Sequence, residues 1–250
     1  MDKFFRELRG ARLRLLMLDY DGTLAPFADD PSEVRPYPEV MRLLDEIMAR
    51  RSDRVIIVTG RSLAQSPPPL PLSRRPEVWG EHGWQREVIG GVRMWNPPAG
   101  AREALALAAE RARALQPWGA RIERKSASVA VHWRGTHHIA AAAIEEELRR
   151  RWAGVAFAGV SAVPFEGGME LRTCARHKGV VVRELLDGAG SETVAAYLGD
   201  DRTDEDAFDA IAGRGVGILV RRTWRPTRAQ AWVTPPDGLV RFLERWRDSA

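Results

Sequence analysis

Residues 13–24, LRLLMLDYDGTL, place two aspartates directly after a run of mostly apolar side chains. Such a run is typical of a strand buried on both faces, and ligands of open α/β sheets collect beyond the carboxyl ends of these strands. Because the chain turns at Gly22, Asp19 and Asp21 can both reach one small volume, one as nucleophile and one as proton carrier. The alternative interpretation is a strand that ends in an ordinary Asp-Gly turn.

Two further segments place reactive groups beside strand-like or helix-like runs. Residues 54–58 form a second buried-strand pattern that leads into residues 59–62, TGRS, whose hydroxyl and backbone amides suit a phosphoryl oxygen. Lys178 precedes the helix-compatible run 180–186, where an ammonium could neutralise a carboxylate or a phosphoryl group. Each segment taken alone could be an ordinary loop or a solvated lysine. Together with Asp19 and Asp21, they indicate one functional site.

Residues 200–206, DDRTDED, hold five carboxylates in seven residues. Thr203 is expected to cap a helix, and the three acidic residues after it suit the positive end of the helix dipole. Capping does not account for Asp200 and Asp201, which repel each other at the end of a strand. A divalent cation would resolve this repulsion, and hard oxygen ligands with few protein contacts favour Mg²⁺.

Four motifs now stand in order along the chain: DYDGTL at 19–24, TGR at 59–61, Lys178, and GDDRTD at 199–204. They resemble the motifs of phosphotransferases of the haloacid dehalogenase superfamily. The resemblance implies an α/β fold with a Rossmann-like core, a parallel sheet with helices on both faces, and a smaller α+β cap domain.

The resemblance also implies an aspartyl-phosphate mechanism. Asp19 would attack phosphorus, and Asp21 would protonate the leaving oxygen and then activate water. Thr59 and Lys178 would hold the phosphoryl oxygens. This division fits phosphoryl transfer, which depends mostly on positioning and charge neutralisation.

A metal site is implied in the same way. Mg²⁺ would be bound by Asp19, by the backbone carbonyl of Asp21 and by Asp200. Asp204 would orient Lys178 or a metal-bound water. The histidines and the single cysteine do not suggest a zinc site, because structural zinc needs more ligands than the pair at 174 and 177 offers.

The segment between the second and third motifs is long enough to form the cap. Its expected elements are helices at 102–115 and 138–152, and strand-like stretches at 120–134 (with a turn), 155–163 and 169–172, with Gly167-Gly168 as a turn. This αββαββ order predicts a cap over residues 98–172 and a core over residues 1–97 and 173–250. Two connections suit hinge closure over a substrate. Strands at 215–220 and 231–233 and a helix at 237–246 are expected to complete the core.

The cap resembles one subfamily, the trehalose-6-phosphate phosphatases, through the stretch 123–134, ERKSASVAVHWR. The segments GEHG at 80–83 and ELR at 170–172 are similar as well. The resemblance implies that these residues bind the substrate: Gly60, Arg61, His82, Gly83, Glu123, Lys125, Arg134 and Glu170. Glutamates can accept hydrogen bonds from sugar hydroxyls, and the basic side chains can donate them.

Other interpretations stay open. The stretch 123–134 could be a plain amphipathic hairpin with Lys125 and Arg134 facing solvent. The sequence departs from the family pattern at Glu81, where asparagine is more usual, and at Thr173, where proline commonly follows the arginine. These departures keep other substrates in view, such as sucrose-6-phosphate or a glycosyl-3-phosphoglycerate.

Two rival classes are a phosphoacceptor signalling domain and a catalytically silent sugar-phosphate sensor. A signalling domain needs neither a proton donor at Asp21 nor a large cap. A sensor need not retain every catalytic residue, whereas the expected set is complete here. The sequence therefore predicts an enzyme that hydrolyses trehalose-6-phosphate to trehalose and phosphate in trehalose biosynthesis.

Composition sets the wider limits. The 250 residues with 44% hydrophobic content can build more than one domain, and the net charge of +4 is spread among acidic residues. We therefore expect no nucleic-acid or membrane partner. The resemblance to the trehalose-6-phosphate phosphatases implies a sugar-phosphate substrate and functional coupling to a trehalose-6-phosphate synthase, and we expect a monomer. Cys174 cannot form an internal disulfide and no apolar run is long enough for a membrane span, which predicts a cytoplasmic location.

Overall fold

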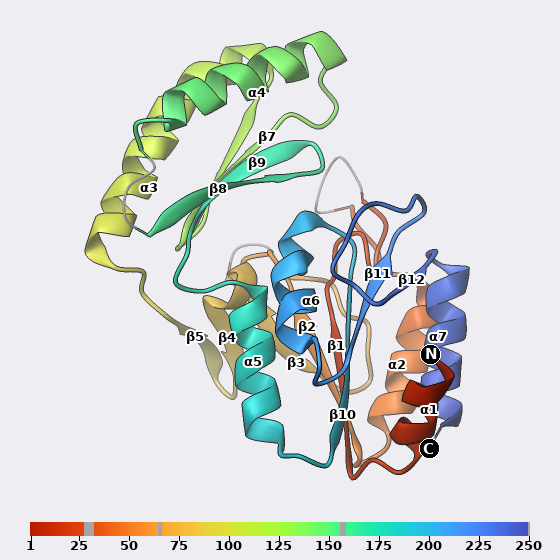
Figure 1. The fold of residues 1–250 in the computed structure, drawn as a ribbon. Coiled ribbons are helices and arrows are strands. Elements are labelled where there is room, and N and C mark those ends of the chain that lie inside the picture. Colours follow the sequence, from red (N-terminus) through yellow and green to blue (C-terminus); the bar gives the residue numbers. More distant parts are fainter. Residues whose placement is uncertain (28–32, 65–66, 156–158, 250) are drawn as a thin grey trace. The chain divides into compact units, whose positions relative to one another are not determined.

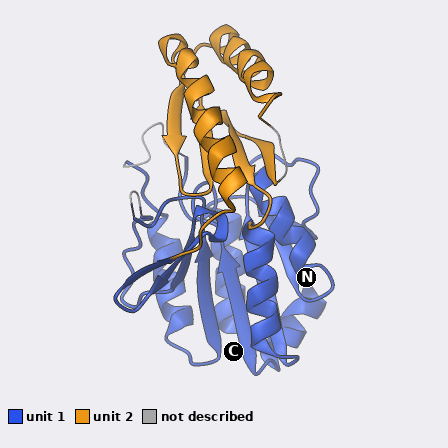
Figure 2. Cartoon of the chain, turned by 90° about the vertical axis from the view of Figure 1, so that its left-hand side faces the viewer, with its two compact units in different colours: residues 1–93, 177–250 blue, residues 94–176 orange. Residues whose placement is uncertain are grey.

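The computed structural model describes residues 1–27, 33–64, 67–155 and 159–249. The chain forms two compact units, residues 1–93 with 177–250 and residues 94–176, here called the core unit and the cap unit (Figure 2). The domain boundaries expected at 97/98 and 172/173 lie close to these divisions, and the assignment of the units as catalytic and specificity domains stays a prediction.

An eight-stranded sheet forms the centre of the core unit, in the order β12-β11-β10-β1-β2-β3-β4-β5. Six strands run parallel: β1 (Leu13–Leu18), β2 (Asp53–Val58), β3 (Glu77–Gly80), β10 (Thr193–Gly199), β11 (Val216–Val220) and β12 (Ala231–Val233). The strand β4 (Gln85–Val88) is antiparallel to β3, and β5 (Gly91–Met94) lies at the edge. The predicted α/β class with a mostly parallel sheet is confirmed.

Helices cover both faces of this sheet (Figure 1). The helices α1 (Asp2–Arg9), α2 (Pro38–Met48) and α7 (Asp237–Asp248) pack together on one face, and α5 (Lys178–Ala189) and α6 (Glu205–Ile211) pack on the other. Leu16 and Leu18 of β1 join the apolar cluster under α2 and α7, so the equally buried Leu15 and Met17 point to the opposite face. Among the described helices, none has the length and hydropathy to cross a membrane.

The acidic segment after β10 begins differently from the prediction. A 3-10 helix, Arg202–Asp204, precedes α6, and its cap is Asp201, whose side chain accepts from the Arg202 amide. The Asp201 side chain also accepts from the Asp204 amide, and the Asp204 side chain accepts from the Asp201 amide, which together form a capping box. The prediction that Thr203 caps the helix is therefore wrong, because the side chains of Asp201 and Asp204 accept from the backbone amides at the start of this segment.

The cap unit follows the αββαββ order. It contains α3 (Ala99–Ala112), a 3-10 helix (Arg113–Trp118), β6 (Arg121–Arg124), β7 (Ser128–His132), α4 (His138–Trp152), β8 (Val160–Phe165) and β9 (Gly168–Thr173). The four strands form an antiparallel sheet in the order β6-β7-β9-β8. Gly168 opens β9 instead of lying in the turn, and part of the strand expected at 155–163 falls outside the described residues.

One face of the cap sheet carries the apolar core of this unit. Val129 and Val131 of β7 and Leu171 of β9 are almost fully buried in one cluster with Leu148 of α4 and Leu105 of α3. Burial of each such side chain contributes about 1.5–3 kcal/mol. Because neighbouring residues of a strand point to opposite faces, the residues between these valines and leucines lie on the other face of the sheet.

Candidate active site

The strand order brings the predicted catalytic groups to one edge of the core sheet. Asp19 follows β1, Thr59 follows β2 and Asp200 follows β10. These three strands are parallel neighbours, so their carboxyl ends lie side by side. Lys178 opens α5, and Asp204 ends the 3-10 helix after β10.

A buried lysine joins two of the aspartates. Lys178 Nζ lies 2.6 Å from Asp19 Oδ1 and 2.8 Å from Asp204 Oδ1. All three side chains are at most 6% exposed. Burial lowers the pKa of Lys178, but the two carboxylates outweigh it and raise that pKa overall. The ammonium therefore stays charged at neutral pH.

Asp204 is fixed by four donors. Besides Lys178, the Tyr197 hydroxyl donates to Oδ1 at 2.6 Å, and the Asp200 and Asp201 amides donate to Oδ2 at 3.1 and 3.0 Å. Burial and the nearby Asp204 charge raise the pKa of Tyr197 well above its ordinary value, so the phenol stays a donor. Sequence reasoning missed Tyr197, because a tyrosine in a buried strand usually indicates core packing alone.

Three buried carboxylates gather beside this one ammonium. Asp19, Asp200 and Asp204 each offer an oxygen atom within 4.8 Å of the others. Burial raises the pKa of Asp19 to about 7, with Lys178 opposing the shift and Asp204 adding to it. Burial and the Asp19 charge also raise the pKa of Asp200 well above its ordinary value. Fully ionised, the three carboxylates would carry more negative charge than Lys178 can neutralise, so their donor set fits a hard divalent cation.

Gly22 makes this gathering sterically feasible. Its φ of +86° lies in the left-handed region, and a Cβ there would lie 2.2 Å from Asp200 Oδ2. The next residue, Thr23, places its buried hydroxyl 3.5 Å from Asp200 Oδ1. Only glycine combines this backbone conformation with such a close approach.

Asp21 is oriented by an arginine. Arg61 Nε and Nη2 lie 2.8 and 2.7 Å from the two carboxylate oxygens of Asp21, which is a bidentate ion pair. The guanidinium also lies 5.1 Å from the centre of the Tyr20 ring. Arg61 was expected to bind substrate; its contacts within the core unit instead orient the predicted proton carrier, and a role toward the sugar stays a prediction.

Thr59 and the segment 81–83 pack against each other. Thr59 is fully buried, and its Oγ1 accepts from the Arg61 amide at 3.1 Å, which leaves the hydroxyl proton available to donate. The His82 amide donates to the Thr59 carbonyl at 3.0 Å, and the His82 ring covers Gly60. Glu81 and His82 both adopt positive φ, 47° and 57°. Two adjacent strained non-glycine residues are typical of a functional segment.

Arg225 also escaped sequence reasoning. Its Nη2 donates to the Asp201 carbonyl at 2.7 Å, and its Nη1 pairs with Glu205. Thr227 donates to the same carboxylate at 2.9 Å. The loop after β11 thus holds the acidic segment in place. No motif could reveal this, because the partners lie about two dozen residues apart in irregular structure.

The cap unit brings three of its four predicted sugar-binding residues together. Lys125 Nζ lies 3.3 Å from Glu170 Oε1 and 3.9 Å from Glu123 Oε1. Lys125 is only 9% exposed, so the alternative of a solvent-facing Lys125 is wrong. Burial raises the pKa of Glu123, but His132 and Lys125 outweigh it and lower that pKa to about 2. Arg134 instead donates to the Glu166 carbonyl at 2.6 Å, at the turn between β8 and β9.

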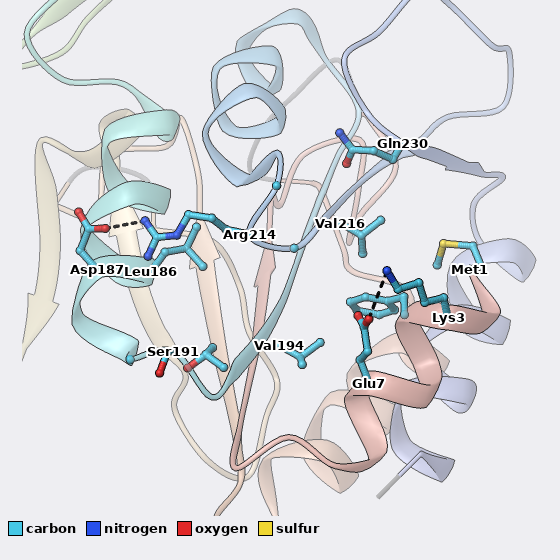
Figure 3. A pocket seen from close by; sticks show the side chains of 15 residues that line it. Met1, Lys3, Glu7, Leu186, Asp187, Ser191, Val194, Arg214, Val216 and Gln230 are labelled. Atoms are coloured by element: carbon cyan, nitrogen blue, oxygen red, sulfur yellow. Dashed lines mark hydrogen bonds and ion pairs between the residues drawn. The ribbon is translucent and has the colours of Figure 1, made fainter.

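A separate hollow of about 1020 Å³ lies at the other end of the core sheet (Figure 3). It is lined by Thr193, the first residue of β10, and by charged side chains that pair with one another. Arg214 lies 2.5 Å from Asp187, and Lys3 lies 3.7 Å from Glu7. The catalytic motifs follow the carboxyl ends of the strands, so this hollow is not the site they form.

Solved structures identify the class of this fold. A phosphatase of the haloalkanoate (HAD) enzyme superfamily from Bacteroides thetaiotaomicron matches with a TM-score of 0.60 and 15% identity, over 94% of this chain and 95% of that one. The C-terminal domain of trehalose-6-phosphate phosphatase from C. albicans matches with a TM-score of 0.80 and 20% identity, over 99% and 96% of the two chains. The fold is therefore the one that these phosphatases share.

Sequence comparison assigns the chain to one family within this class of fold. The trehalose-phosphatase family model matches residues 17–231. The trehalose-phosphate phosphatase of Mycobacterium tuberculosis is 30% identical over 246 residues, which cover 94% of this chain and 60% of that protein. The chain therefore belongs to the trehalose-phosphatase family, and the resemblance noted from its motifs is confirmed. It spans about 60% of the length of this relative.

Proposed function

We propose that this protein is a Mg²⁺-dependent phosphoric monoester hydrolase that converts trehalose-6-phosphate to trehalose and phosphate in trehalose biosynthesis. One observation carries the proposal. Lys178 bridges Asp19 and Asp204 in a buried network, while Arg61 orients Asp21, in a chain of the trehalose-phosphatase family.

In the first step, an Asp19 carboxylate oxygen forms a bond to phosphorus, and the bond from phosphorus to the sugar oxygen breaks. Asp21 gives its proton to that leaving oxygen, so the sugar departs as a neutral alcohol. Lys178 compensates charge on Asp19 and on the phosphoryl group, and the Thr59 hydroxyl donates to a phosphoryl oxygen.

In the second step, water attacks the phosphorus of the aspartyl-phosphate, and the bond to Asp19 breaks. Asp21 takes the proton of the water, which returns both residues to their starting states. The bidentate pair with Arg61 orients Asp21 in its ionised form, the form that takes the proton of the water.

Asp19, Asp200 and the carbonyl of Asp21 would hold Mg²⁺. When bound, the cation neutralises the phosphoryl oxygens and the excess carboxylate charge. Asp204 would act through Lys178, which it contacts directly.

We further propose that Glu123, Lys125, Arg134 and Glu170 bind the sugar. Carboxylates and an ammonium on one face of the cap sheet suit a ligand rich in hydroxyl groups. Gly60, His82 and Gly83 are proposed to contribute from the core unit.

The setting is proposed as the cytoplasm, where the single cysteine stays reduced. The protein would act there as a monomer, downstream of a trehalose-6-phosphate synthase that makes its substrate. Gel filtration coupled to light scattering tests the monomer directly.

The decisive experiment measures phosphate release by the purified protein with Mg²⁺. Trehalose-6-phosphate is compared with glucose-6-phosphate, sucrose-6-phosphate and mannosyl-3-phosphoglycerate, and Asp19→Asn serves as the blank. We expect strong preference for trehalose-6-phosphate, lost in the variant and on chelation of the metal. Activity on another member of the panel would keep the mechanism and overturn the substrate, and no release from any member would favour the sensor.

A further inference from the structure

The register of the cap sheet places several polar residues on one face. Ala130 of β7 pairs with Glu123 of β6 on one side and with Glu170 of β9 on the other. Directly paired residues share a face, and so do residues two apart on a strand. Ser128 and His132, which flank Ala130 along β7, therefore lie on the face that carries both glutamates.

Each of these two β7 residues contacts one glutamate. Ser128 Oγ donates to Glu170 Oε1 at 2.7 Å, and His132 Nε2 lies 2.9 Å from Glu123 Oε2. An ionised carboxylate can only accept, so His132 Nε2 carries the proton in this contact. Two residues from one strand thus hold two carboxylates on its two neighbouring strands.

Ser128 and His132 are themselves held in place by their surroundings. Ser128 is 4% exposed, and Ala130, which lies between Ser128 and His132 on this face, is 1% exposed. The Phe165 ring lies edge-on to His132, with centroids 5.2 Å apart, and it covers Gly168, where a Cβ would lie 2.1 Å from the ring. His132 is therefore packed from one side and hydrogen-bonded from the other.

We propose that Ser128 and His132 are positioning residues for recognition of the disaccharide: each fixes one glutamate so that its remaining lone pairs accept hydroxyl groups of the sugar. This inference rests on the proposed function, because it takes Glu123 and Glu170 as sugar ligands. A carboxylate side chain that is already fixed before binding does not have to be ordered when the sugar binds, so binding loses less entropy. Neither residue needs to touch the substrate.

Two pairs of variants test the proposal. Ser128→Ala and His132→Phe remove the donors, and His132→Phe keeps a ring beside Phe165. Ser128→Thr and His132→Gln restore a donor at nearly the same place. His138→Phe, at the exposed start of α4, is the matched control. Kinetics are measured with trehalose-6-phosphate and with p-nitrophenyl phosphate, which carries no sugar.

We expect Ser128→Ala and His132→Phe each to raise KM for trehalose-6-phosphate up to about tenfold, because the glutamate must then be ordered when the sugar binds. Hydrolysis of p-nitrophenyl phosphate and the Tm should change little, and Ser128→Thr and His132→Gln should recover most of the loss. Unchanged KM in both donor-less variants would overturn the proposal. Equal loss on both substrates, or no recovery in the restoring variants, would also overturn it, because either result indicates a general structural role. A wild-type protein that hydrolyses only p-nitrophenyl phosphate would instead reject the proposed function.

Discussion

The core unit and the cap unit both carry clusters of acidic and basic side chains, but they bury them to different degrees. Asp19, Lys178 and Asp204 are at most 6% exposed, and each hydrogen bond among them lies within the core unit. On the cap sheet, Glu123 is 31% exposed and His132 21% exposed. The core network is closed on itself, whereas the cap cluster is buried at Glu170 and Lys125, which are 3% and 9% exposed, and open at Glu123 and His132.

This difference in burial indicates that the two clusters have different roles. Buried charges interact strongly and do not rearrange, which suits groups that must stabilise a transition state. A partly exposed carboxylate such as Glu123 can accept hydrogen bonds from a ligand while its side chain is held in place. We therefore expect core variants to lower the rate on every phosphate ester, and cap variants to affect only substrates that carry the sugar.

The largest effect is expected from Asp19→Asn. An amide is a poor nucleophile and cannot carry the phosphoryl group, so kcat should fall by at least about 10⁴-fold on trehalose-6-phosphate and on p-nitrophenyl phosphate alike. Phosphate release under saturating substrate measures this. Asp187→Asn, an exposed aspartate on α5, is the control. Residual activity on one of the two esters would contradict a shared nucleophile.

The second largest effect is expected from a variant of the cap unit. Glu170→Gln keeps the shape of the side chain but removes the charge that Lys125 and Ser128 contact. We expect kcat/KM for trehalose-6-phosphate to fall about 10²-fold, because one charged hydrogen-bond acceptor is worth up to about 3 kcal/mol.

The same variant should hydrolyse p-nitrophenyl phosphate like the wild type, and Glu146→Gln, on the exposed face of α4, should change neither substrate. A matching loss on the aryl ester would break the division between the two units.

The parallel core could be predicted from sequence because its signals are local. The apolar run before Asp19 is β1, residues 231–233 are β12, and the carboxyl ends of neighbouring parallel strands must meet. What could not be predicted are contacts between distant polar groups. Tyr197 looked like a core residue, and Arg225 lies in an irregular loop without a motif.

Capping at the acidic segment was mispredicted for a related reason. Thr203 is a good cap by composition, but Asp201 and Asp204 form a reciprocal pair that propensity alone does not reveal. In the cap unit, Glu123 and Lys125 are close in the sequence and also in the structure, whereas the contact of Arg134 with the β8–β9 turn depends on a loop conformation that no pattern encodes.

A smaller effect is expected from Tyr197→Phe, which removes one of the donors to Asp204 without creating a cavity. Asp204 should then hold Lys178 less firmly, and kcat should fall about tenfold with KM unchanged. The loss should be equal on trehalose-6-phosphate and p-nitrophenyl phosphate, because Tyr197 belongs to the closed core network. A change in KM confined to the sugar substrate would show that this network is not separate from recognition.

The smallest effect concerns stability at acid pH. Glu123 has a folded-state pKa of about 2 against an ordinary value of 4.5, mainly because His132 and Lys125 outweigh the effect of burial. A depressed carboxyl pKa stabilises the folded state above pH 4.5, and this contribution is lost as the pH falls toward 2. Glu123→Gln should therefore lower the Tm by about 2–4 °C near neutral pH, as expected for a loss of about 1 kcal/mol of folding free energy after solvent screening. Below pH 4.5 the difference in Tm between variant and wild type should shrink as the pH falls. Glu146→Gln, an exposed glutamate on α4, serves as the control in the same calorimetric series. A Tm difference that stays constant down to pH 3 would mean that the contacts of Glu123 do not favour its charged form. The cap unit would then lack a fixed carboxylate at this position, and the proposed difference between the two clusters would fail.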